Sequence, residues 1–222
     1  MDKIKKNILE NNKLITSIFG TIGVKGLSLL ISLFTTSAYM HYFADDKVLG
    51  TWLSLITILN WIINFDLGVG NGLRNKLVQA LADNDKVKAK QYVSSGYVIL
   101  GVVSLIIIVI GNIGFSFVDW NSLLNISQDI INPEILVLVV RILFSGIILQ
   151  FFLRTIISIL YAVQKPALAN LITLLSHSLI LLFVSFTHIE NVSKSLVVLA
   201  VIQCIAVNLP MILATLYIFI FK

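Results

Sequence analysis

The chain of 222 residues is too apolar for an ordinary soluble domain. Apolar residues make up 58% of it and charged residues only 12%, whereas soluble domains average about 45–50% and about 25%. The formal net charge is +5, but the basic residues are distributed by loop, which does not predict a nucleic-acid partner. A single cysteine, Cys204, excludes a disulfide framework and gives no metal-binding spacing. We therefore expect an all-α polytopic membrane protein with no metal and no cofactor.

Six segments are long enough to cross a bilayer, which takes about 20 apolar residues per helix. They are residues 14–40, 48–72, 92–117, 135–161, 167–187 and 195–221. The chain is thus predicted to form one bundle of six transmembrane helices over residues 1–222.

The first segment carries a polar stripe with a cation near its middle. At about 100° per residue the stripe covers roughly a third of the helix surface, and it consists of Thr21, Lys25, Ser28, Ser32, Thr36 and Tyr39. A charge at the centre of a membrane helix costs about 2.5–3.5 kcal/mol on insertion scales. We therefore expect Lys25, Ser28 and Ser32 to line a polar cavity that accepts an anionic or polar ligand.

The second segment ends in NFDLGVGNGLRNKL, residues 64–77. In a regular helix Asn60, Asn64 and Asn71 share one side of this segment. These asparagines are candidate cavity residues as well.

Asp66 and the glycines of this segment allow more than one interpretation. Gly68 and Gly72 are spaced for close helix packing through small residues, but they also suit a local unwinding next to a substrate or a gate. Asp66 is the candidate charge partner of a cation such as Lys25 or Arg74, because an unpaired carboxylate is costly in the membrane.

Residues 73–90 connect the second and third segments. Leu73, Leu77, Val78 and Leu81 recur at helical spacing within this stretch. We expect a short amphipathic helix at the cytoplasmic membrane surface.

The fourth segment holds Arg141 and Arg154, which lie about 140° apart around a helix. Both are candidate ligand contacts, on different faces. Arg154 shares its face with Gln150, Ser158 and Tyr161, although it can also reach the membrane surface by snorkelling. The fifth segment adds a weaker polar face, made of Asn170, Thr173 and His177.

Basic residues gather at alternate loops. Eleven lie before the first segment, between the second and third, and at the later ends of the same side: Lys3, Lys5, Lys6, Lys13, Arg74, Lys76, Lys86, Lys88, Lys90, Lys165 and Lys222. The opposite loops hold only two, Lys47 and Lys194. By the positive-inside rule, both termini are expected in the cytoplasm.

The run FDLGVGNGLRNKLVQALADND, together with the cationic first segment and the basic loop, resembles the N-terminal half of Wzx-type polysaccharide-unit (O-antigen) flippases. These belong to the multidrug/oligosaccharidyl-lipid/polysaccharide exporter superfamily. The resemblance is sharpest over residues 14–95 and only hydropathic beyond them. It implies one six-helix lobe of a two-lobed exporter in a bacterial inner membrane.

The resemblance also implies a substrate and a partner. Such exporters move polyprenyl-diphosphate-linked oligosaccharides across the membrane through a cationic cavity, without covalent catalysis. Lys25, Arg74, Arg141 and Arg154 become candidate contacts for the diphosphate or for acidic sugars. Because the sequence ends after six segments, we expect a separate six-helix lobe, or a second copy of the chain, to complete the transporter.

Three alternatives stay open from the sequence. A drug or cation antiporter of the same superfamily would favour buried carboxylates, and only Asp66 lies in the apolar segments, against four cations. A membrane glycosyltransferase could use Asp45 and Asp46 in the first outer loop as acid, base or metal ligands. The third alternative is an inactive membrane remnant or scaffold.

The charge asymmetry makes the topology testable. Reporter fusions at Lys86 and Lys222 should give a cytoplasmic signal, and fusions at Asp129 and Asn191 an external one, because basic loops are retained inside. A cytoplasmic signal at Asp129 would overturn the assignment of six crossings.

Overall fold

The computed structural model describes residues 2–43, 45–64 and 68–221, with side chains described from Phe19 onward except for Asn64, Ile220 and Phe221. This part of the chain is helical and contains no β-strand. The elements are α1 (Asp2–Tyr42), α2 (Asp46–Asn64), α3 (Val69–Ala82), α4 (Lys86–Gly114), η1 (Phe115–Phe117), α5 (Trp120–Leu123), α6 (Pro133–Leu153), α7 (Thr155–Ala162), α8 (Pro166–Phe186) and α9 (Val192–Phe221).

Six stretches of these helices are long and apolar enough to cross a membrane. They are Phe19–Tyr42, Asp46–Ile63, Lys86–Phe117, Pro133–Ala162, Pro166–Phe186 and Val192–Phe219. The all-α bundle predicted from composition is thereby confirmed, and the chain is a multi-pass membrane protein.

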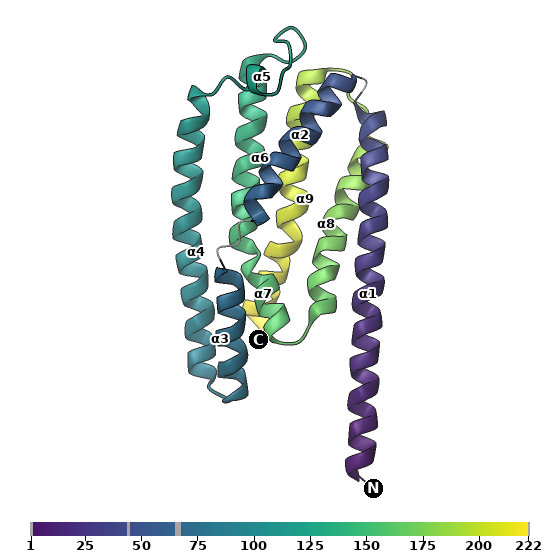
Figure 1. The fold of residues 1–222 in the computed structure, drawn as a ribbon, viewed down its shortest axis with the longest axis vertical. Helices are drawn as coiled ribbons and strands as arrows, with labels where there is room; N and C mark the ends of the chain where they lie inside the picture. Colours follow the sequence, from purple (N-terminus) through teal and green to yellow (C-terminus); the bar gives the residue numbers. More distant parts are fainter. Residues whose placement is uncertain (1, 44, 65–67, 222) are drawn as a thin grey trace.

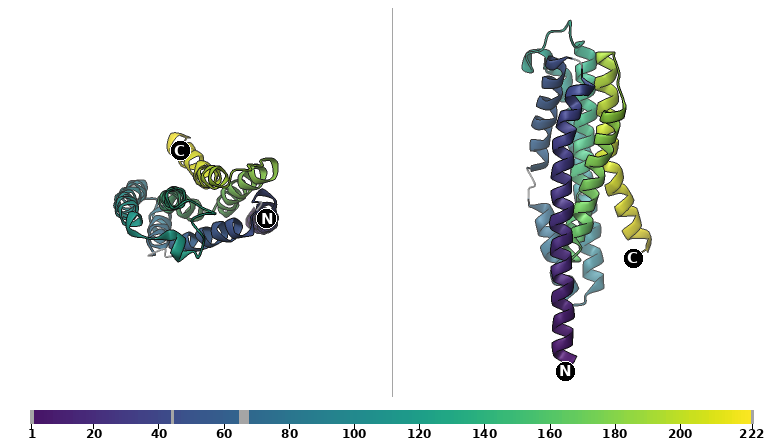
Figure 2. Two further views of the ribbon diagram at one scale, coloured as in Figure 1. Left: turned by 90° about the horizontal axis from the view of Figure 1, so that it is seen from above. Right: turned by 90° about the vertical axis from the view of Figure 1, so that its right-hand side faces the viewer.

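The helices form an elongated bundle with α6 and α9 at its centre (Figure 1). α6 packs against α9, α4 and α2, whereas α1 packs chiefly against α8 at the opposite edge. α1 begins and α9 ends toward the same end of the bundle, and α5 lies at the other end (Figure 1). Viewed from the side, the last turns of α9 lean away from the other helices (Figure 2).

Two of the predicted membrane-spanning segments are each divided into two helices, α2 and α3 in one and α6 and α7 in the other. The predicted segment 48–72 is divided into α2 and α3, and Gly68, just before α3, has a left-handed backbone with φ 75°. Glycine adopts this conformation without a steric penalty, unlike other residues. Arg154 separates α6 from α7, and the N–H of Ile157 donates to the Arg154 carbonyl at 2.9 Å. This bond between residues three apart makes a tight turn at the junction.

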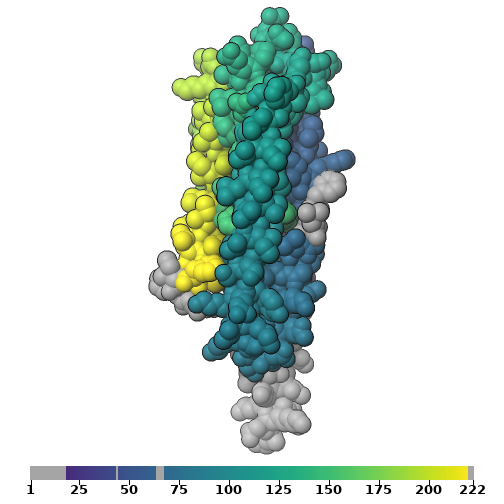
Figure 3. Space-filling model, turned by 90° about the vertical axis from the view of Figure 1, so that its left-hand side faces the viewer, coloured from purple at the N-terminus to yellow at the C-terminus, as the bar shows by residue number. Residues whose placement is uncertain are grey.

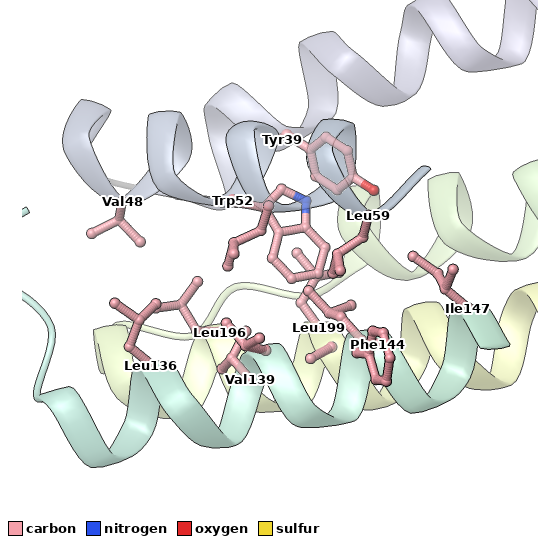
Figure 4. Close-up of a cluster of buried hydrophobic side chains, with 14 of the residues drawn as sticks. Tyr39, Val48, Trp52, Leu59, Leu136, Val139, Phe144, Ile147, Leu196 and Leu199 are labelled. Carbon is pink, nitrogen blue, oxygen red and sulfur yellow. The ribbon is translucent and has the colours of Figure 1, made fainter. Parts of the chain in front are cut away.

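The apolar core consists of two clusters. The first joins the last turns of α1 and the length of α2 to α6, α8 and α9, and it includes Tyr39, Trp52, Leu136, Leu143 and Leu199. In Figure 4 the Trp52 ring lies between α2 and the leucine and valine side chains of α6 and α9. The second cluster joins α3 and α7 to α4, α8 and α9, and its members include Leu77, Ile156, Leu160, Ile172 and Met211.

The outward faces of the bundle are apolar. α4 runs down the middle of one side of the molecule, with α9 on one flank and α2 and α3 on the other (Figure 3). The exposed residues of α4 include Val98, Ile99, Val102, Leu105, Ile106, Val109 and Ile110. A continuous apolar helix surface of this kind is suited to lipid rather than to water.

The expected amphipathic helix corresponds to α3, which runs alongside the lower part of α4 (Figure 1). Leu73 and Leu77 are buried, as their spacing suggested, but Val78 and Leu81 are exposed. Leu73 fills the space beside Gly96 of α4, where an added Cβ would lie 3.0 Å from the leucine side chain. The apolar face of α3 therefore serves packing against α4 and α7, and its position at the membrane surface stays a prediction.

The centre of the bundle depends on a close approach between α6 and α9. A Cβ added to Gly146 would lie 2.7 Å from Cys204 Sγ and 3.4 Å from the Cys204 Cα. The Asn208 side-chain N–H donates to the Gly146 carbonyl at 3.0 Å and to the Cys204 carbonyl at 2.8 Å. A glycine is thus required for the two backbones to lie this close.

Replacing Gly146 with alanine should therefore destabilise the fold by about 1–3 kcal/mol, the usual cost of overpacking. Gly50→Ala is the matched control, because no described atom lies within 4 Å of the added Cβ. Thermal unfolding of the purified protein in detergent should give a lower midpoint for Gly146→Ala than for the wild type. A midpoint as high as that of Gly50→Ala would contradict the close approach.

Candidate functional site

Polar side chains lie between the two apolar clusters along the long axis of the bundle. On α6 the first cluster extends to Ile148 and the second begins at Leu153, with Gln150 between them. On α8 the boundary falls between Ile172 and Ile180, which brackets His177. Two cavities open at this level, here called the lower pocket and the upper pocket.

The lower pocket contains two arginines. It has a volume of about 160 Å³ and is lined by Ile63, Gly70, Asn71, Arg74, Leu100, Phe151, Arg154, Thr155, Ile157, Ser158 and Tyr161. Arg74, Arg154 and Asn71, three of the candidates predicted from sequence, meet in it. The charged side chains among these described lining residues are the two arginines.

The positions of both arginines follow from the interruptions of the helices. Arg154 sits at the junction of α6 and α7, and its Nη1 donates to the carbonyl of Ile63 at 3.3 Å, near the end of α2. Arg74 comes from the first turns of α3, and its guanidinium carbon lies 5.5 Å from the centre of the Tyr161 ring. This cation–π contact holds Arg74 beside the pocket without neutralising its charge.

The upper pocket is polar, and no lysine, arginine or carboxylate is among its described lining residues. Its volume is about 120 Å³, and its lining residues are Ile56, Asn60, Leu143, Gly146, Ile147, Gln150, His177, Ile180, Gln203, Cys204 and Val207. Asn60 is the only one of these that was a candidate site residue from the sequence. The polar groups that converge here are side-chain amides and one imidazole.

The two pockets are stacked along shared walls. Gln150 of the upper pocket and Arg154 of the lower pocket are four residues apart on α6, which is about 6 Å along a helix. On α2, Asn60 of the upper pocket and Ile63 of the lower pocket are three residues apart. The cationic pocket and the neutral pocket are therefore neighbours one helical turn apart.

The polar stripe on α1 is divided between the interface with α8 and an exposed flank. Ser28 is buried at the interface with α8, where its hydroxyl lies 3.1 Å from His177 Nδ1. Thr21 lies at the same interface, since its carbonyl accepts a bond from the Asn170 side chain. Lys25 and Ser32 are exposed on the adjoining flank of α1 and line neither pocket. α8 thus covers one edge of the stripe and leaves the other uncovered.

Hydroxyl groups on α1 find their partners within the helix itself. Thr35 Oγ1 donates to the Ile31 carbonyl at 2.8 Å, and Thr36 Oγ1 donates to the Ser32 carbonyl at 3.2 Å. Such bonds to the preceding turn satisfy a hydroxyl without a cavity. A stripe of serine and threonine is consequently weaker evidence for a wet cavity than Lys25 itself.

The asparagines of the second segment are divided by the break at Gly68. Asn60 is in the upper pocket and Asn71 in the lower one, whereas Asp66 and the side chain of Asn64 lie outside the described residues. No described atom lies within 4 Å of a Cβ built on Gly68 or Gly72. The described contacts therefore favour an interrupted helix over close packing as the role of these glycines.

Arg141 is in the wall of neither pocket. Its Nη2 donates to the hydroxyl of Ser116 in η1, at the end of the bundle that carries α5. Its Nε is buried and makes no hydrogen bond in the described structure. Arg141 thus links α6 to η1 and does not join Arg74 and Arg154.

Of the two aspartates considered for a glycosyltransferase, Asp45 caps the N-terminus of α2. Asp45 Oδ1 accepts bonds from the backbone N–H groups of Lys47 and Val48 at 2.7 and 3.1 Å. This is the geometry of an N-cap at the start of α2. Asp45 therefore has a structural role that accounts for its position.

Sequence reasoning missed Gln203, which the structure places in the upper pocket with Gln150 and His177. Its signal was weak, because a single glutamine in the apolar sixth segment has no polar neighbour at helical spacing that marks a face. Ser158 and Tyr161, grouped with Arg154 by periodicity, do line the lower pocket.

Comparison of the chain with protein-family models, with curated proteins and with solved structures found no match.

The two pockets predict a pattern of thiol reactivity in a Cys204→Ala background. Cysteines at Asn71 and Ser158 should react with a charged thiol reagent, because they line the lower pocket, whereas cysteines at Ile99 and Leu105 should not, because their surface is apolar. Cysteine at Ser28 should also be protected by α8. Labelling can be followed by a mass shift, and equal labelling of Ser158→Cys and Leu105→Cys would contradict an aqueous pocket.

Proposed function

We propose that this protein takes part in the export of polyprenyl-diphosphate-linked oligosaccharide units for cell-surface polysaccharide synthesis, as a six-helix lobe in a bacterial inner membrane. The observation that carries the proposal is the convergence of Arg74 and Arg154 on one pocket. The lower pocket is the anion site of the transporter. No covalent step is part of this function.

The chemistry of the lower pocket suits a diphosphate. A guanidinium presents planar, paired donors that match the oxygens of a phosphate, and its charge is retained at all physiological pH values. Arg74 has no carboxylate within ion-pair distance in the described structure. Arg154 uses one nitrogen on the Ile63 carbonyl and retains other donors. Both arginine side chains are exposed, which leaves their remaining donors accessible to a diphosphate.

The arrangement of the rest of the bundle supports movement across the membrane. The apolar outer surface of α4 is in lipid, where the polyprenyl tail of the substrate also lies. Lys25, exposed on the flank of α1, is a second cation on the substrate path. A second six-helix lobe, or another copy of the chain, faces that flank and encloses the path. Both termini are cytoplasmic.

A drug or cation antiporter is less well supported. A cation site in a membrane helix bundle requires carboxylates that face the interior. Neither pocket is lined by an acidic residue among the described side chains. The charge around the site thus favours an anionic substrate.

The proposal can be tested with inverted membrane vesicles from cells that express the full chain, so that any partner lobe is present. The substrate is a short-chain polyprenyl-diphosphate-linked disaccharide with a fluorescent label, and its appearance in the vesicle lumen is measured. Arg74→Gln should lower the initial rate about tenfold or more, because a hydrogen bond to a charged group contributes about 1.5–3 kcal/mol. Arg74→Lys should retain part of the rate, because it keeps the charge.

Lys76→Gln is the matched control, since this lysine of α3 is exposed and lines neither pocket. Lys25→Ala and Lys25→Gln should both reduce transport, and Lys25→Arg should restore part of it. The amount of folded protein in the membrane is checked for each variant by size-exclusion chromatography. Transport at the wild-type rate by Arg74→Gln would reject the lower pocket as the anion site.

A further inference from the structure

The upper pocket contains two glutamine side chains that keep hydrogen-bonding groups available. The Gln150 side chain makes no hydrogen bond with any described residue, and Gln203 has only a long one, in which the Tyr39 hydroxyl donates to its Oε1 at 3.5 Å. The side-chain N–H groups of both glutamines therefore remain available. Both side chains are half-buried, which leaves them accessible to water or to a ligand in the pocket.

The imidazole of His177 adds a further polar group. Its Nδ1 lies 3.1 Å from the Ser28 hydroxyl and 3.4 Å from the Ser28 carbonyl. The other ring nitrogen, Nε2, is left as a donor or an acceptor, depending on the tautomer. The upper pocket thus combines amide donors and acceptors with one imidazole, and no lysine, arginine or carboxylate is among its described lining residues.

The size of the upper pocket sets the size of its occupant. Its volume of about 120 Å³ is close to the cavity of roughly 150 Å³ that admits a benzene ring. The apolar residues Ile56, Leu143 and Ile147 form the remainder of the wall. A sugar with hydroxyl or acetamido groups has about twice as many non-hydrogen atoms as benzene, so the pocket has room for one edge of such a ring and its polar groups, not for the whole sugar.

The position of the upper pocket adds a constraint. It lies one helical turn from Arg154, along α6. In a sugar linked to a lipid through a diphosphate, the first sugar ring is bonded directly to a phosphate oxygen. A diphosphate on Arg74 and Arg154 would bring that ring to the level of Gln150.

We propose that the upper pocket binds one polar edge of the first sugar of the lipid-linked substrate and selects an uncharged sugar, whose hydroxyl or acetamido groups pair with Gln150, Gln203 and His177. This inference rests on the proposed function, because it requires a diphosphate in the lower pocket. An acidic sugar at this position is disfavoured, because no lysine or arginine is among the described lining residues of the upper pocket to pair with its carboxylate.

The test compares three soluble probes bound to the purified full-length chain in lipid nanodiscs. The probes are farnesyl diphosphate, the same diphosphate carrying N-acetylglucosamine, and the same diphosphate carrying glucuronic acid. The wild type should bind the N-acetylglucosamine probe about tenfold more tightly than farnesyl diphosphate, which corresponds to one or two net hydrogen bonds. The glucuronic acid probe should show no such gain.

The decisive measurement is the ratio of the dissociation constants of the bare and the N-acetylglucosamine probes. Gln150→Leu and Gln203→Leu should each lower this ratio, and together they should bring it to about one. Gln91→Leu, at an exposed position of α4 outside both pockets, should leave the ratio as in the wild type. The leucine variants keep the side-chain volume, and their folded state is verified by size-exclusion chromatography.

The possible results separate the two proposals. Equal binding of the bare and the N-acetylglucosamine probes by the wild type would overturn the sugar pocket while leaving the anion site intact. An equal gain from glucuronic acid would overturn the selection of an uncharged sugar. If none of the diphosphate probes binds, the anion site itself fails, and the sugar pocket fails with it.

Discussion

Lipid offers no hydrogen-bond partner to a protein backbone, so a helix that is interrupted inside a membrane bundle must satisfy its freed groups within the protein. Two interruptions lie near each other here, at Gly68 and at Arg154. The Arg154 guanidinium donates to the Ile63 carbonyl close to the end of α2. The side chain at the junction of α6 and α7 thereby pairs with a carbonyl group near the end of α2. The position of Arg154, and with it the lower pocket, follows from this requirement.

Polar side chains, among them Gln150 of α6 and His177 of α8, form a layer between the two apolar clusters. The cluster built around Trp52 and the cluster built around Ile156 are separated on α6 and α8 by polar residues. Polar side chains in such a layer must pair with one another, with water or with a ligand. Ser28 and His177 pair directly, whereas Gln150 does not. The layer therefore combines a structural contact between α1 and α8 with groups that are free to bind.

Charge is unevenly distributed over this layer. The lower pocket has two guanidinium groups, and the upper pocket has only neutral amides and an imidazole. An ionised group and an uncharged polar group need different environments, because the cost of burying a charge is much larger than that of burying an amide. A ligand that is anionic at one end and neutral at the other satisfies both pockets at once. The difference in charge between the two pockets would orient such a ligand along the bundle axis, with its anionic end in the lower pocket.

The six crossings were determined by the sequence alone, because the transfer of apolar residues into lipid depends on local composition and length. Periodicity also placed Ser158 and Tyr161 beside Arg154, since they share a face of one helix. The meeting of Arg74 with Arg154, the burial of Ser28 against His177 and the inclusion of Gln203 were decided only by the tertiary structure. Each depends on how a helix is rotated about its axis against its neighbours, and the meeting of the two arginines also depends on the helix break at Gly68. The rotation of a helix is set by packing between segments far apart in sequence.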